Sequence, residues 1–540
     1  MRLWAGLLTV VVALTVLNAQ DASAPGGDSI RRQDLEGDVR FLASERLTGR
    51  LTDTDGNRRA VEFIAARFQR QRLLPAGADG TYFHRFDLMT AALGENNQLT
   101  VIGGEDQYRL GRDFYPDPSS GTASAGGPVV FVGFGIEAPE LGHNDYRSTD
   151  LAGKVALILD HEPGEFDAES RFEGRRRSEE TRVVRKVLAA QRRGAVAVLV
   201  APDVHNHAGQ RIFNRSMTQV WPTFPPRVPR YSLAIWLDQI EIPVLQISTE
   251  VAAALMTDGE TFEDLSRTAE HPAGVMPIAL AGPEIEVTTT VSRNRIPNRS
   301  VVGLIEGADP MLRGEWIILS AHLDHEGEVN GRIFRGADDD ASGVAALIEI
   351  AEAYALAAQA GARPDRSILF AAWNSEEQGL LGAWAYTEDP LHPLRQTVAV
   401  LNMDMIGRNE EVPPEAGPRF TGLRQQTADS NRNAVNLLGY SRSPDLRTAS
   451  ERANRDIDLD LKFRYDNNRS NLLQRSDQWP FLYRRVPALF VHTGLHPDYH
   501  TERDRPDTLN YEKMTRIVRF VHQLSWDLAQ AGNRPAYVAP

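Results

Sequence analysis

The stretch Glu315–Gly327 reads EWIILSAHLDHEG, and it indicates the class of fold that we expect for the chain. Apolar and small residues follow one another without polar alternation until His322 and Asp324 appear at the end of the run. A strand that is buried on both faces has this pattern, because neither face meets water. Strands of this kind occur in sheets that helices cover on both sides.

Other parts of the chain repeat this pattern. Further apolar runs are SVVGLIEG at 300–307, SILFAAWNSEE at 367–377, VAVLNMDMIG at 398–407 and PALFVHTG at 487–494. Segments with apolar residues at three- and four-residue spacing separate several of these runs, and we expect helices at 340–358, 377–387 and 508–530. We therefore predict an α/β fold with a mostly parallel (mixed) sheet sandwiched by helices.

The chain has 540 residues, which is too long for one ordinary domain. A Gly/Ser/Pro/Ala-rich stretch, PSSGTASAGGP at 118–128, opens a second series of short strand and helix patterns that ends near residue 282. The predicted organisation is a signal peptide and linker at 1–24, the N-terminal part of the main domain at 30–117, a smaller inserted α/β domain at 118–282, and the rest of the main domain at 283–540.

Charge and composition exclude several classes of partner. The formal net charge of −14 argues against binding to nucleic acid or to an anionic membrane. The chain has no cysteine, so it has no disulfide, no thiol nucleophile and no thiolate metal ligand. Any metal ion must be held by histidine and carboxylate side chains.

The N-terminus has the pattern of an export signal. Arg2 precedes the apolar run Leu3–Leu17, and small residues follow, with cleavage expected after Ala19 or Ala24. The alternative is an uncleaved membrane anchor, but the run is short for a membrane span. We expect a periplasmic or extracellular protein that has no contact with the membrane after cleavage.

Charged and imidazole side chains follow the predicted strands, at the end of the sheet where open α/β proteins bind their ligands. These residues are His322, Asp324, Asp339, Glu376, Glu377, Asp404 and His500. A cluster of buried carboxylates is costly unless a cation lies among them. Imidazole and carboxylate ligands suit zinc and, less selectively, cobalt or manganese. Two ions that share one carboxylate would form a hydrolytic pair.

Three consecutive acids, Asp338 to Asp340, open the predicted helix after Gly336. Neighbouring side chains point apart, so we expect one of the three to bridge the metal ions. The other two are expected to stabilise the start of the helix, where the helix dipole favours negative charge.

The motifs AHLDHEG, GADDDASG, NSEEQGLLG, LNMDMIG and HPDYHTERDRPDTL occur in this order, and together they resemble the di-zinc metallopeptidases of the bacterial leucyl aminopeptidase, aminopeptidase S and aminopeptidase Y kind. The resemblance spans roughly residues 30–530 and implies a zinc-exopeptidase-like fold for the main domain. The inserted segment resembles a protease-associated (PA) domain, through FVGFGIEAPELGHNDYRSTDLAGKVALIL at 131–159.

The resemblance also implies roles for the site residues. Asp339 corresponds to the ligand that bridges two zinc ions; the other implied zinc ligands are His322 and Asp404 for one ion and Glu377 and His500 for the other. Glu376 corresponds to the general base that acts on a metal-bridging hydroxide, and Asp324 to the carboxylate that orients the ring of His322. The implied protein is an exported aminopeptidase that removes N-terminal residues from peptides.

Alternatives on the same fold are a carboxypeptidase of the glutamate carboxypeptidase kind, a glutaminyl cyclase with one zinc ion, and a non-catalytic relative such as a transferrin receptor. The preferred N-terminal residue, the peptide length and the oligomeric state stay open. We expect Met405 to line the substrate pocket and Gln478, which stands where many members have histidine, to touch it.

One further pair of histidines is notable, His205 and His207 in DVHNHAG. Their spacing suits a metal ion, but no supporting carboxylate pattern is evident near them, so we expect an exposed loop.

Overall fold

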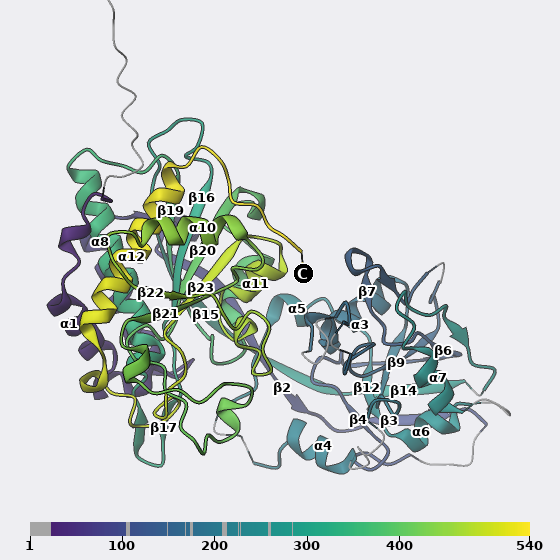
Figure 1. Ribbon diagram of the computed structural model, residues 1–540. Helices are drawn as coiled ribbons and strands as arrows, with labels where there is room; N and C mark the ends of the chain where they lie inside the picture. The colour runs from purple at the N-terminus through teal and green to yellow at the C-terminus, as the bar shows by residue number, and fades with distance from the viewer. Residues whose placement is uncertain are drawn as a thin grey trace, which may run out of the picture.

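The computed structural model describes residues 23–539, except 104–107, 148–149, 168, 173–176, 208–212, 225, 227, 257–260 and 283. The apolar run that we interpret as an export signal lies outside the described residues. The described chain forms two α/β units that a long two-stranded ribbon joins (Figure 1).

The larger unit contains a ten-stranded mixed sheet. Its strands, in spatial order, are β11 (Ser232–Leu233), β2 (Phe83–Leu93), β15 (Val291–Ile305), β19 (Ser367–Trp373), β16 (Trp316–His322), β20 (Thr397–Met403), β23 (Ala488–His492), β21 (Ala434–Leu438) and β22 (Asp460–Lys462), with β1 (Leu74–Pro75) beside β15. Strands β19, β16, β20 and β23 pair in parallel, whereas β2, β15 and β19 pair antiparallel. The predicted α/β class is confirmed, and the parallel pairing is concentrated at the centre.

The central strands are apolar throughout because both faces of the sheet are covered. In β19, Ile368 and Phe370 face one hydrophobic core, and Leu369 and Trp373 face another. The helices that contribute to the first core are α1 (Arg32–Leu42), α2 (Asp55–Arg70), α8 (Gly343–Gln359), α10 (Pro444–Ala453) and α12 (Tyr511–Gln530). Those that contribute to the second are α5 (Ala234–Leu237), α9 (Leu381–Glu388) and α11 (Trp479–Tyr483).

Helix α8 is the central helix of the first layer. With the preceding turn it forms Ala337–Gln359, which is long and apolar enough to cross a membrane by composition alone. It contacts β16, α1 and α12, and 83% of its most apolar window is buried inside the protein. A helix that is apolar on all sides in a folded domain is a core helix.

The smaller unit has its own six-stranded sheet. Its strands, in spatial order, are β13 (Ile278–Ala279), β6 (Val129–Phe131), β9 (Val155–Leu159), β10 (Ala197–Ala201), β12 (Val244–Ile247) and β4 (Phe114–Pro116). A three-stranded sheet of β3 (Gln98–Val101), β14 (Ile285–Thr289) and β5 (Ala123–Gly127) lies in the same unit (Figure 1). The helices of this unit are α3 (Val183–Arg192), α4 (Phe213–Val220), α6 (Thr249–Ala254) and α7 (Phe262–Thr268).

The smaller unit therefore extends beyond the predicted boundaries of 118 and 282. Strands β3 and β4 precede residue 118, and β14 follows residue 282. The Gly/Ser/Pro/Ala-rich stretch at 118–128 is not a free linker, because β5 within it pairs with β14. Small residues are compatible with a free linker and also with a strand. The pairing of β5 with the distant β14 decides between the two.

The ribbon of β2 and β15 holds the two units together. The two strands pair continuously, from Phe83 opposite Val301 to Leu93 opposite Val291. At the far end Arg293 donates hydrogen bonds to the carbonyl oxygens of Ser119 and Ser120, both at 2.8 Å. One continuous pair of strands thus belongs to the central sheet at one end and contacts the smaller unit at the other (Figure 1).

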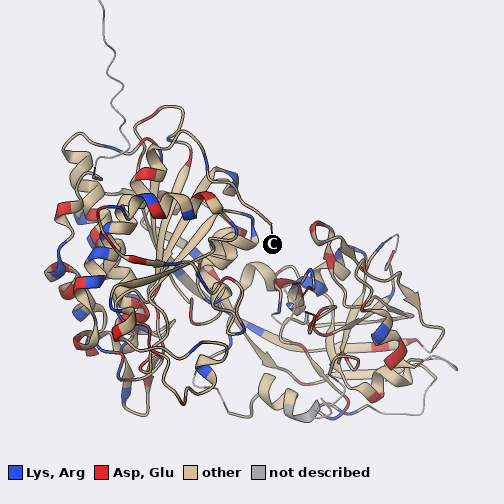
Figure 2. Cartoon of the chain, viewed as in Figure 1, with Lys and Arg blue, Asp and Glu red and all other residues tan. Residues whose placement is uncertain are grey.

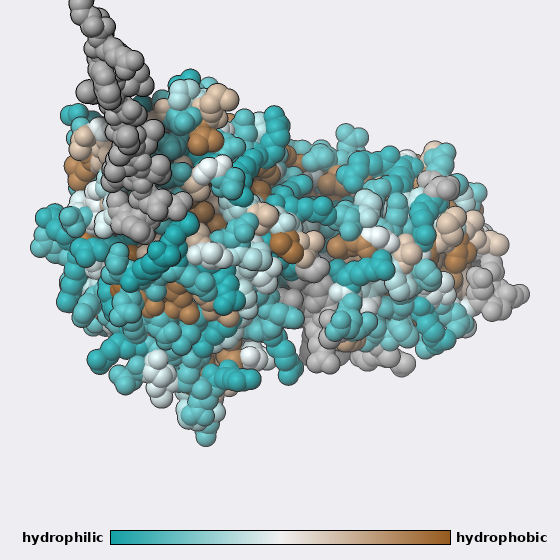
Figure 3. Space-filling model, turned by 45° about the horizontal axis from the view of Figure 1, so that its top comes forward, coloured by the Kyte–Doolittle hydropathy of each residue, from teal (hydrophilic) through white to brown (hydrophobic). Residues whose placement is uncertain are grey.

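Charged side chains lie mainly on the helices and loops, whereas the central strands carry few (Figure 2). The surface in Figure 3 is mostly hydrophilic over both units. The segment 410–475, which has no clear sequence pattern, supplies β21, α10 and β22 at the edge of the sheet.

A buried arginine ties the N-terminal segment to the loops at the carboxyl end of the sheet. The Arg50 side chain, in a residue that is 1% exposed, donates to the carbonyl oxygens of Leu323, Leu42, Arg335 and Gly336 at 2.7–2.9 Å. Leu323 follows β16, and Gly336 precedes the acidic triplet. One guanidinium group thus satisfies several backbone carbonyl groups that are wholly or partly buried.

We expect Arg50→Met to lower the free energy of unfolding by at least about 3 kcal/mol, because buried carbonyl oxygens lose their donors. Chemical denaturation followed by tryptophan fluorescence measures the change. The control is Arg46→Met, an exposed residue in the same segment, which should stay within about 0.5 kcal/mol of the parent. Equal shifts for the two variants would contradict this role of Arg50.

Candidate metal centre and active site

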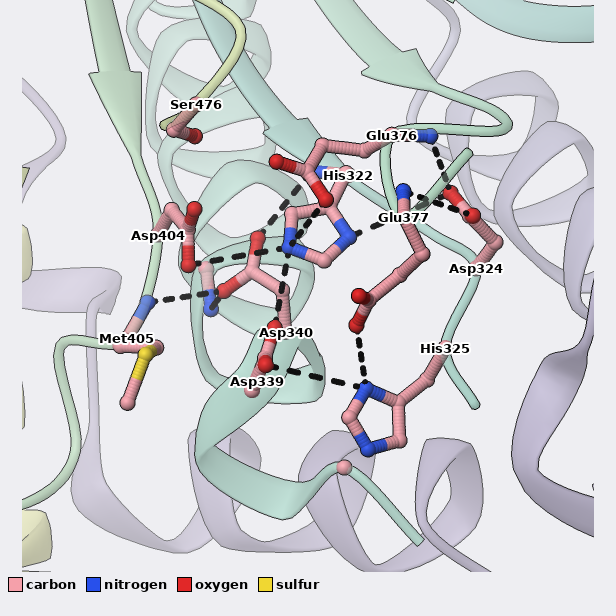
Figure 4. A network of polar contacts seen from close by, with 12 residues as sticks. His322, Asp324, His325, Asp339, Asp340, Glu376, Glu377, Asp404, Met405 and Ser476 are labelled. Atoms are coloured by element: carbon pink, nitrogen blue, oxygen red, sulfur yellow. Dashed lines mark hydrogen bonds and ion pairs between the residues drawn. The ribbon is translucent and has the colours of Figure 1, made fainter. Parts of the chain in front are cut away.

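The central strands deliver the candidate site residues to one place. β16 ends at His322, Glu376 and Glu377 follow β19, and Asp404 follows β20. The loop after β23 brings His500 to the same place. Figure 4 shows most of these side chains converging on a small volume at the carboxyl ends of the strands. The structure thus places together residues that lie up to 178 positions apart (500 − 322).

Asp339 lies at the centre of the cluster. Its Oδ1 atom is 3.1 Å from Nε2 of His322, and its Oδ2 atom is 3.0 Å from Nε2 of His500. The two oxygen atoms of one carboxylate therefore face different imidazoles. This is the arrangement expected of a carboxylate that two cations share.

The residues on each side of Asp339 form two candidate ligand sets. In one, Nε2 of His322 is 3.1 Å from Asp339 and 3.6 Å from Oδ1 of Asp404. In the other, Nε2 of His500 is 3.0 Å from Asp339 and 3.4 Å from Oε2 of Glu377. Tetrahedral ligands at zinc distances of about 2.0–2.1 Å would be about 3.3 Å apart. The donor atoms thus have the chemistry and the spacing that a zinc ion needs.

The other two acids of the triplet hold the backbone around Asp339. Oδ2 of Asp340 accepts from the amide of His322 at 3.0 Å, and its Oδ1 accepts from the amides of Gly343 and Met405 at 3.1 Å. Oδ1 of Asp338 accepts from the amide of Gly407 at 2.6 Å. Asp340 therefore binds an amide at the start of α8, as we predict, whereas Asp338 binds the backbone of the loop that follows β20.

A glycine lets α8 begin close to the site. A Cβ atom on Gly343 would lie 2.6 Å from the carbonyl oxygen of Met403, the last residue of β20. Any larger residue would push the helix away from the strand that carries Asp404. The small residues after the acidic triplet thus permit the close approach that Asp339 needs.

Further polar groups orient the ligand sets. Glu326 Oε1 lies 3.3 Å from Nδ1 of His500, and His325 Nδ1 lies 2.8 Å from Oε1 of Glu377. A carboxylate on the far nitrogen of an imidazole fixes the ring and leaves the near nitrogen for a metal ion. Sequence reasoning missed Glu326, although its place after His325 in AHLDHEG put it at the same end of the sheet.

Asp324 mainly positions the Glu376–Glu377 turn. Its Oδ1 accepts from the amide of Glu376 at 2.9 Å, and its Oδ2 accepts from the amide of Glu377 at 3.3 Å. Its Oδ1 is 4.0 Å from Nδ1 of His322, which is longer than a hydrogen bond. In the structure Asp324 therefore holds the turn that carries two acidic side chains and lies beside the His322 ring (Figure 4).

Glu376 is a carboxylate that faces the site but belongs to neither of the two candidate ligand sets. Its Oε2 atom is 3.9 Å from Nε2 of His322, and the residue is 8% exposed. Burial raises the pKa of Glu376 well above its usual range. A carboxyl group with a raised pKa beside a metal centre is suited to accept and release a proton.

The imidazoles respond to the surrounding negative charge. Burial lowers the pKa of His322, but the negative charges of Glu376 and Asp404 raise it by a larger amount. The net pKa of His322 therefore lies well above its usual range. His500 follows the same pattern, since Glu377 and Asp339 outweigh burial and raise its pKa to about 9. Protons on the imidazoles thus partly neutralise the carboxylates, and a divalent cation would replace them.

The pocket beside these residues combines polar and apolar walls. Its lining includes Met405, as predicted, together with Leu472, Phe490, Arg475 and Tyr499. Sequence reasoning missed Arg475 and Tyr499, although Tyr499 directly precedes His500. The Tyr499 ring lies 3.9 Å from the His500 ring, and Arg475 donates to its hydroxyl at 3.3 Å.

Gln478 does not touch the pocket, contrary to our expectation. It is fully buried, donates to the carbonyl oxygen of Leu473 at 2.6 Å and accepts from Asn402 at 3.1 Å. Its neighbour Asp477 is also fully buried. The side chain of Gln478 instead links the loop before α11 to β20, which position in the sequence could not show.

Comparisons with known proteins find peptidases that are similar to parts of this chain. Residues 300–525 match the model of peptidase family M28. The chain is 27% identical over 398 residues to aminopeptidase NAALADL1 of Rattus norvegicus, covering 65% of this chain and 48% of that protein. It is 28% identical over 238 residues to the glutamate carboxypeptidase 2 homolog of Caenorhabditis briggsae, covering 42% and 28%.

The chain thus spans about half the length, or less, of these curated relatives. Among solved structures, the aminopeptidase from Aneurinibacillus sp. strain AM-1 aligns with a TM-score of 0.44 and 17% identity, over 95% of this chain and 97% of that chain.

The shared carboxylate leads to a prediction about metal content. Asp339→Ala should abolish zinc binding at both ligand sets, whereas Asp404→Ala should abolish it at one, because only Asp339 belongs to both. Equilibrium dialysis followed by metal analysis measures the number of ions lost. The control is Glu328→Ala, an exposed acid nearby, which should lose none. Equal losses in Asp339→Ala and Asp404→Ala would contradict a shared ligand.

Proposed function

We propose that the protein is an exported zinc aminopeptidase that hydrolyses N-terminal residues from peptides. The observation that carries this proposal is Asp339, which faces two histidine–carboxylate sets beside an additional buried carboxylate, Glu376. The M28 match and an aminopeptidase among the relatives support it.

We propose zinc because the donor set contains only imidazole and carboxylate at tetrahedral spacing, and cobalt or manganese are substitutes. His322, Asp339 and Asp404 would hold one ion, and His500, Asp339 and Glu377 the other. When bound, the two ions would supply an acidified water and would polarise the scissile carbonyl group.

The protein side chains perform the remaining steps. Glu376 accepts a proton from the attacking water and delivers it to the nitrogen of the leaving peptide. Asp324 holds the backbone of Glu376 so that its carboxylate points into the site. The carboxylates of the pocket attract the free amine of the substrate, and the apolar wall of Met405, Leu472 and Phe490 favours an apolar N-terminal side chain.

A carboxypeptidase is the second candidate, and one observation favours it. Arg475 lines the pocket and is exposed there, so it can bind a substrate carboxylate. Glutamate carboxypeptidases occur among the relatives. A glutaminyl cyclase with one zinc ion fits the two ligand sets less well, and a non-catalytic relative would have no need of Glu376.

Two further parts of the proposal concern the rest of the chain. Export to the periplasm or the extracellular space rests on the N-terminal apolar run. The smaller unit is proposed to be a PA-like domain because it is a separate α/β unit within the chain of the peptidase domain. In this role it would shape access for peptide substrates.

The first test is hydrolysis of a panel of aminoacyl-nitroanilides by the zinc-loaded protein. We expect cleavage of leucyl, methionyl and phenylalanyl substrates, inhibition by a chelator, and loss when the substrate amine is acetylated. Glu376→Gln should lower kcat about 10²–10⁴-fold because the proton acceptor is gone. Its zinc content should match the parent, which separates loss of chemistry from loss of metal.

A folded, zinc-loaded protein that cleaves no free-amine substrate would overturn the aminopeptidase assignment. Peptides with a free C-terminus and a blocked N-terminus would then test the carboxypeptidase, and peptides that begin with glutamine would test the cyclase.

Arg475 separates the two peptidase classes. For an aminopeptidase, we expect Arg475→Gln to change kcat/KM for aminoacyl-nitroanilides by less than about tenfold, since these substrates have no carboxylate. For a carboxypeptidase, the same variant should lose at least about tenfold in kcat/KM toward blocked peptides, the equivalent of one charge-assisted hydrogen bond. Arg484→Gln, outside this pocket, is the control.

A further inference from the structure

A second group of metal-ligating side chains lies in the smaller unit. Strands β9 and β10 are parallel neighbours, and Leu159 pairs with Ala201 at their carboxyl ends. Two residues beyond these partners lie His161 and Asp203. The register of the sheet therefore brings together an imidazole and a carboxylate that are 42 residues apart in sequence (203 − 161).

Glu165 and His207 complete the group. Oε2 of Glu165 is 2.7 Å from Nδ1 of His161 and 2.6 Å from Nε2 of His207, and the two ring nitrogens are 2.6 Å apart. The rings are nearly perpendicular, at 86°. An oxygen of Asp203 lies within 4.8 Å of the other three ligand atoms.

Hydrogen bonding accounts poorly for this arrangement. A carboxylate oxygen can accept from both imidazoles only if both ring nitrogens carry a proton. Those two protons would then crowd into a gap of 2.6 Å between His161 and His207. If one nitrogen lacks its proton, its lone pair faces the negative oxygen of Glu165. A cation between the two ring nitrogens and Oε2 of Glu165 would remove both the crowding of protons and the repulsion between lone pair and carboxylate. Each pair of these atoms would have to separate by only about 0.6 Å to reach tetrahedral zinc spacing.

The surroundings resemble those of a metal site. Asp160 accepts from the amide of His161 at 2.8 Å, and its Oδ2 lies 3.4 Å from Nε2 of the same ring. This carboxylate would orient the imidazole with Nδ1 toward the ion. Asp203 is 2% exposed, and Oδ1 accepts from the hydroxyl of Ser266 at 3.1 Å.

The backbone of His161 is held in the left-handed region, with φ of 65°. Such a conformation is uncommon in a residue other than glycine and is often found at ligand-binding positions. The buried amine of Lys186 donates to the carbonyl oxygen of His161 and keeps it in place.

One basic side chain competes with a metal ion. Nη2 of Arg177 is 3.1 Å from Nε2 of His161, and its Nε is 3.8 Å from Oε1 of Glu165. The Arg177 side chain is 59% exposed. Because it reaches the cluster from the solvent side, it can turn outward when a cation supplies the positive charge.

We propose that His161, Glu165, Asp203 and His207 bind one zinc ion, separate from the peptidase centre. Two imidazoles and two carboxylates without a thiolate suit zinc and, less selectively, manganese or cobalt. Four protein ligands in a largely buried position leave no open place for a substrate, so the role is structural. The ion ties together the loops that follow β9 and β10.

The same cluster corrects the expectation that His205 and His207 lie together in an exposed loop. His205 is exposed, but His207 turns inward to Glu165. The carboxylate that supports His207 comes from 42 residues earlier in the chain (207 − 165), so a local search of the sequence missed it.

The test is the zinc content of the full-length protein after loading and exhaustive dialysis. We expect three ions per chain in the parent and two in His207→Ala and in Glu165→Gln. His205→Ala is the matched control from the same loop and should keep three. Asp339→Ala should keep one ion, and adding His207→Ala to it should remove that ion.

Equal zinc content in the parent, His207→Ala and Glu165→Gln would overturn the proposal, as would an Asp339→Ala protein that holds no zinc. If His207→Ala does not fold by circular dichroism, His161→Asn replaces it, because asparagine tolerates a positive φ. This site can fail while the peptidase centre keeps its two ions, so the outcome is independent of the proposed function.

Discussion

The neutralisation of buried carboxylates is the constraint on which the main domain depends. Asp339, Glu376, Glu377 and Asp404 meet at the carboxyl ends of the central strands, where their side chains are largely buried. Negative charges that are buried close together repel one another strongly unless a cation lies between them. The imidazoles of His322 and His500 lie against the same Asp339 carboxylate and offer the nitrogen ligands that such a cation needs.

The architecture around the cluster serves to hold these groups in place. Asp340 binds the amides of His322 and Met405, and Asp338 binds that of Gly407, so the acidic triplet fixes the strand ends that surround it. Arg50 fixes the loops on either side from the N-terminal segment. The apolar helix α8 sets the position of the triplet, because it packs directly on β16. Each of these hydrogen bonds is buried, and losing one would leave a polar group without a partner.

The smaller unit repeats the same physical principle on a different sheet. Parallel strands end at one edge, and polar residues just beyond their ends come together there, as His161 and Asp203 do beyond β9 and β10. The two sheets are joined by the β2–β15 ribbon, which leaves each cluster within its own unit. The proposed structural zinc would therefore stabilise the loops of the smaller unit without taking part in the chemistry of the larger one.

The sequence by itself determined the class of fold, the main strands and the residues that meet at the candidate metal centre. Uninterrupted apolar runs such as IILSAHL mark buried strands, and each motif follows such a run directly. Tertiary structure decided what depends on distant pairing. It placed β3, β4 and β14 in the smaller unit, turned Gln478 into the core, and brought Glu165 to His207. The physical reason is that a side chain's charge and polarity are local properties, whereas its partners depend on the register of strands and the packing of loops that are far apart in the chain.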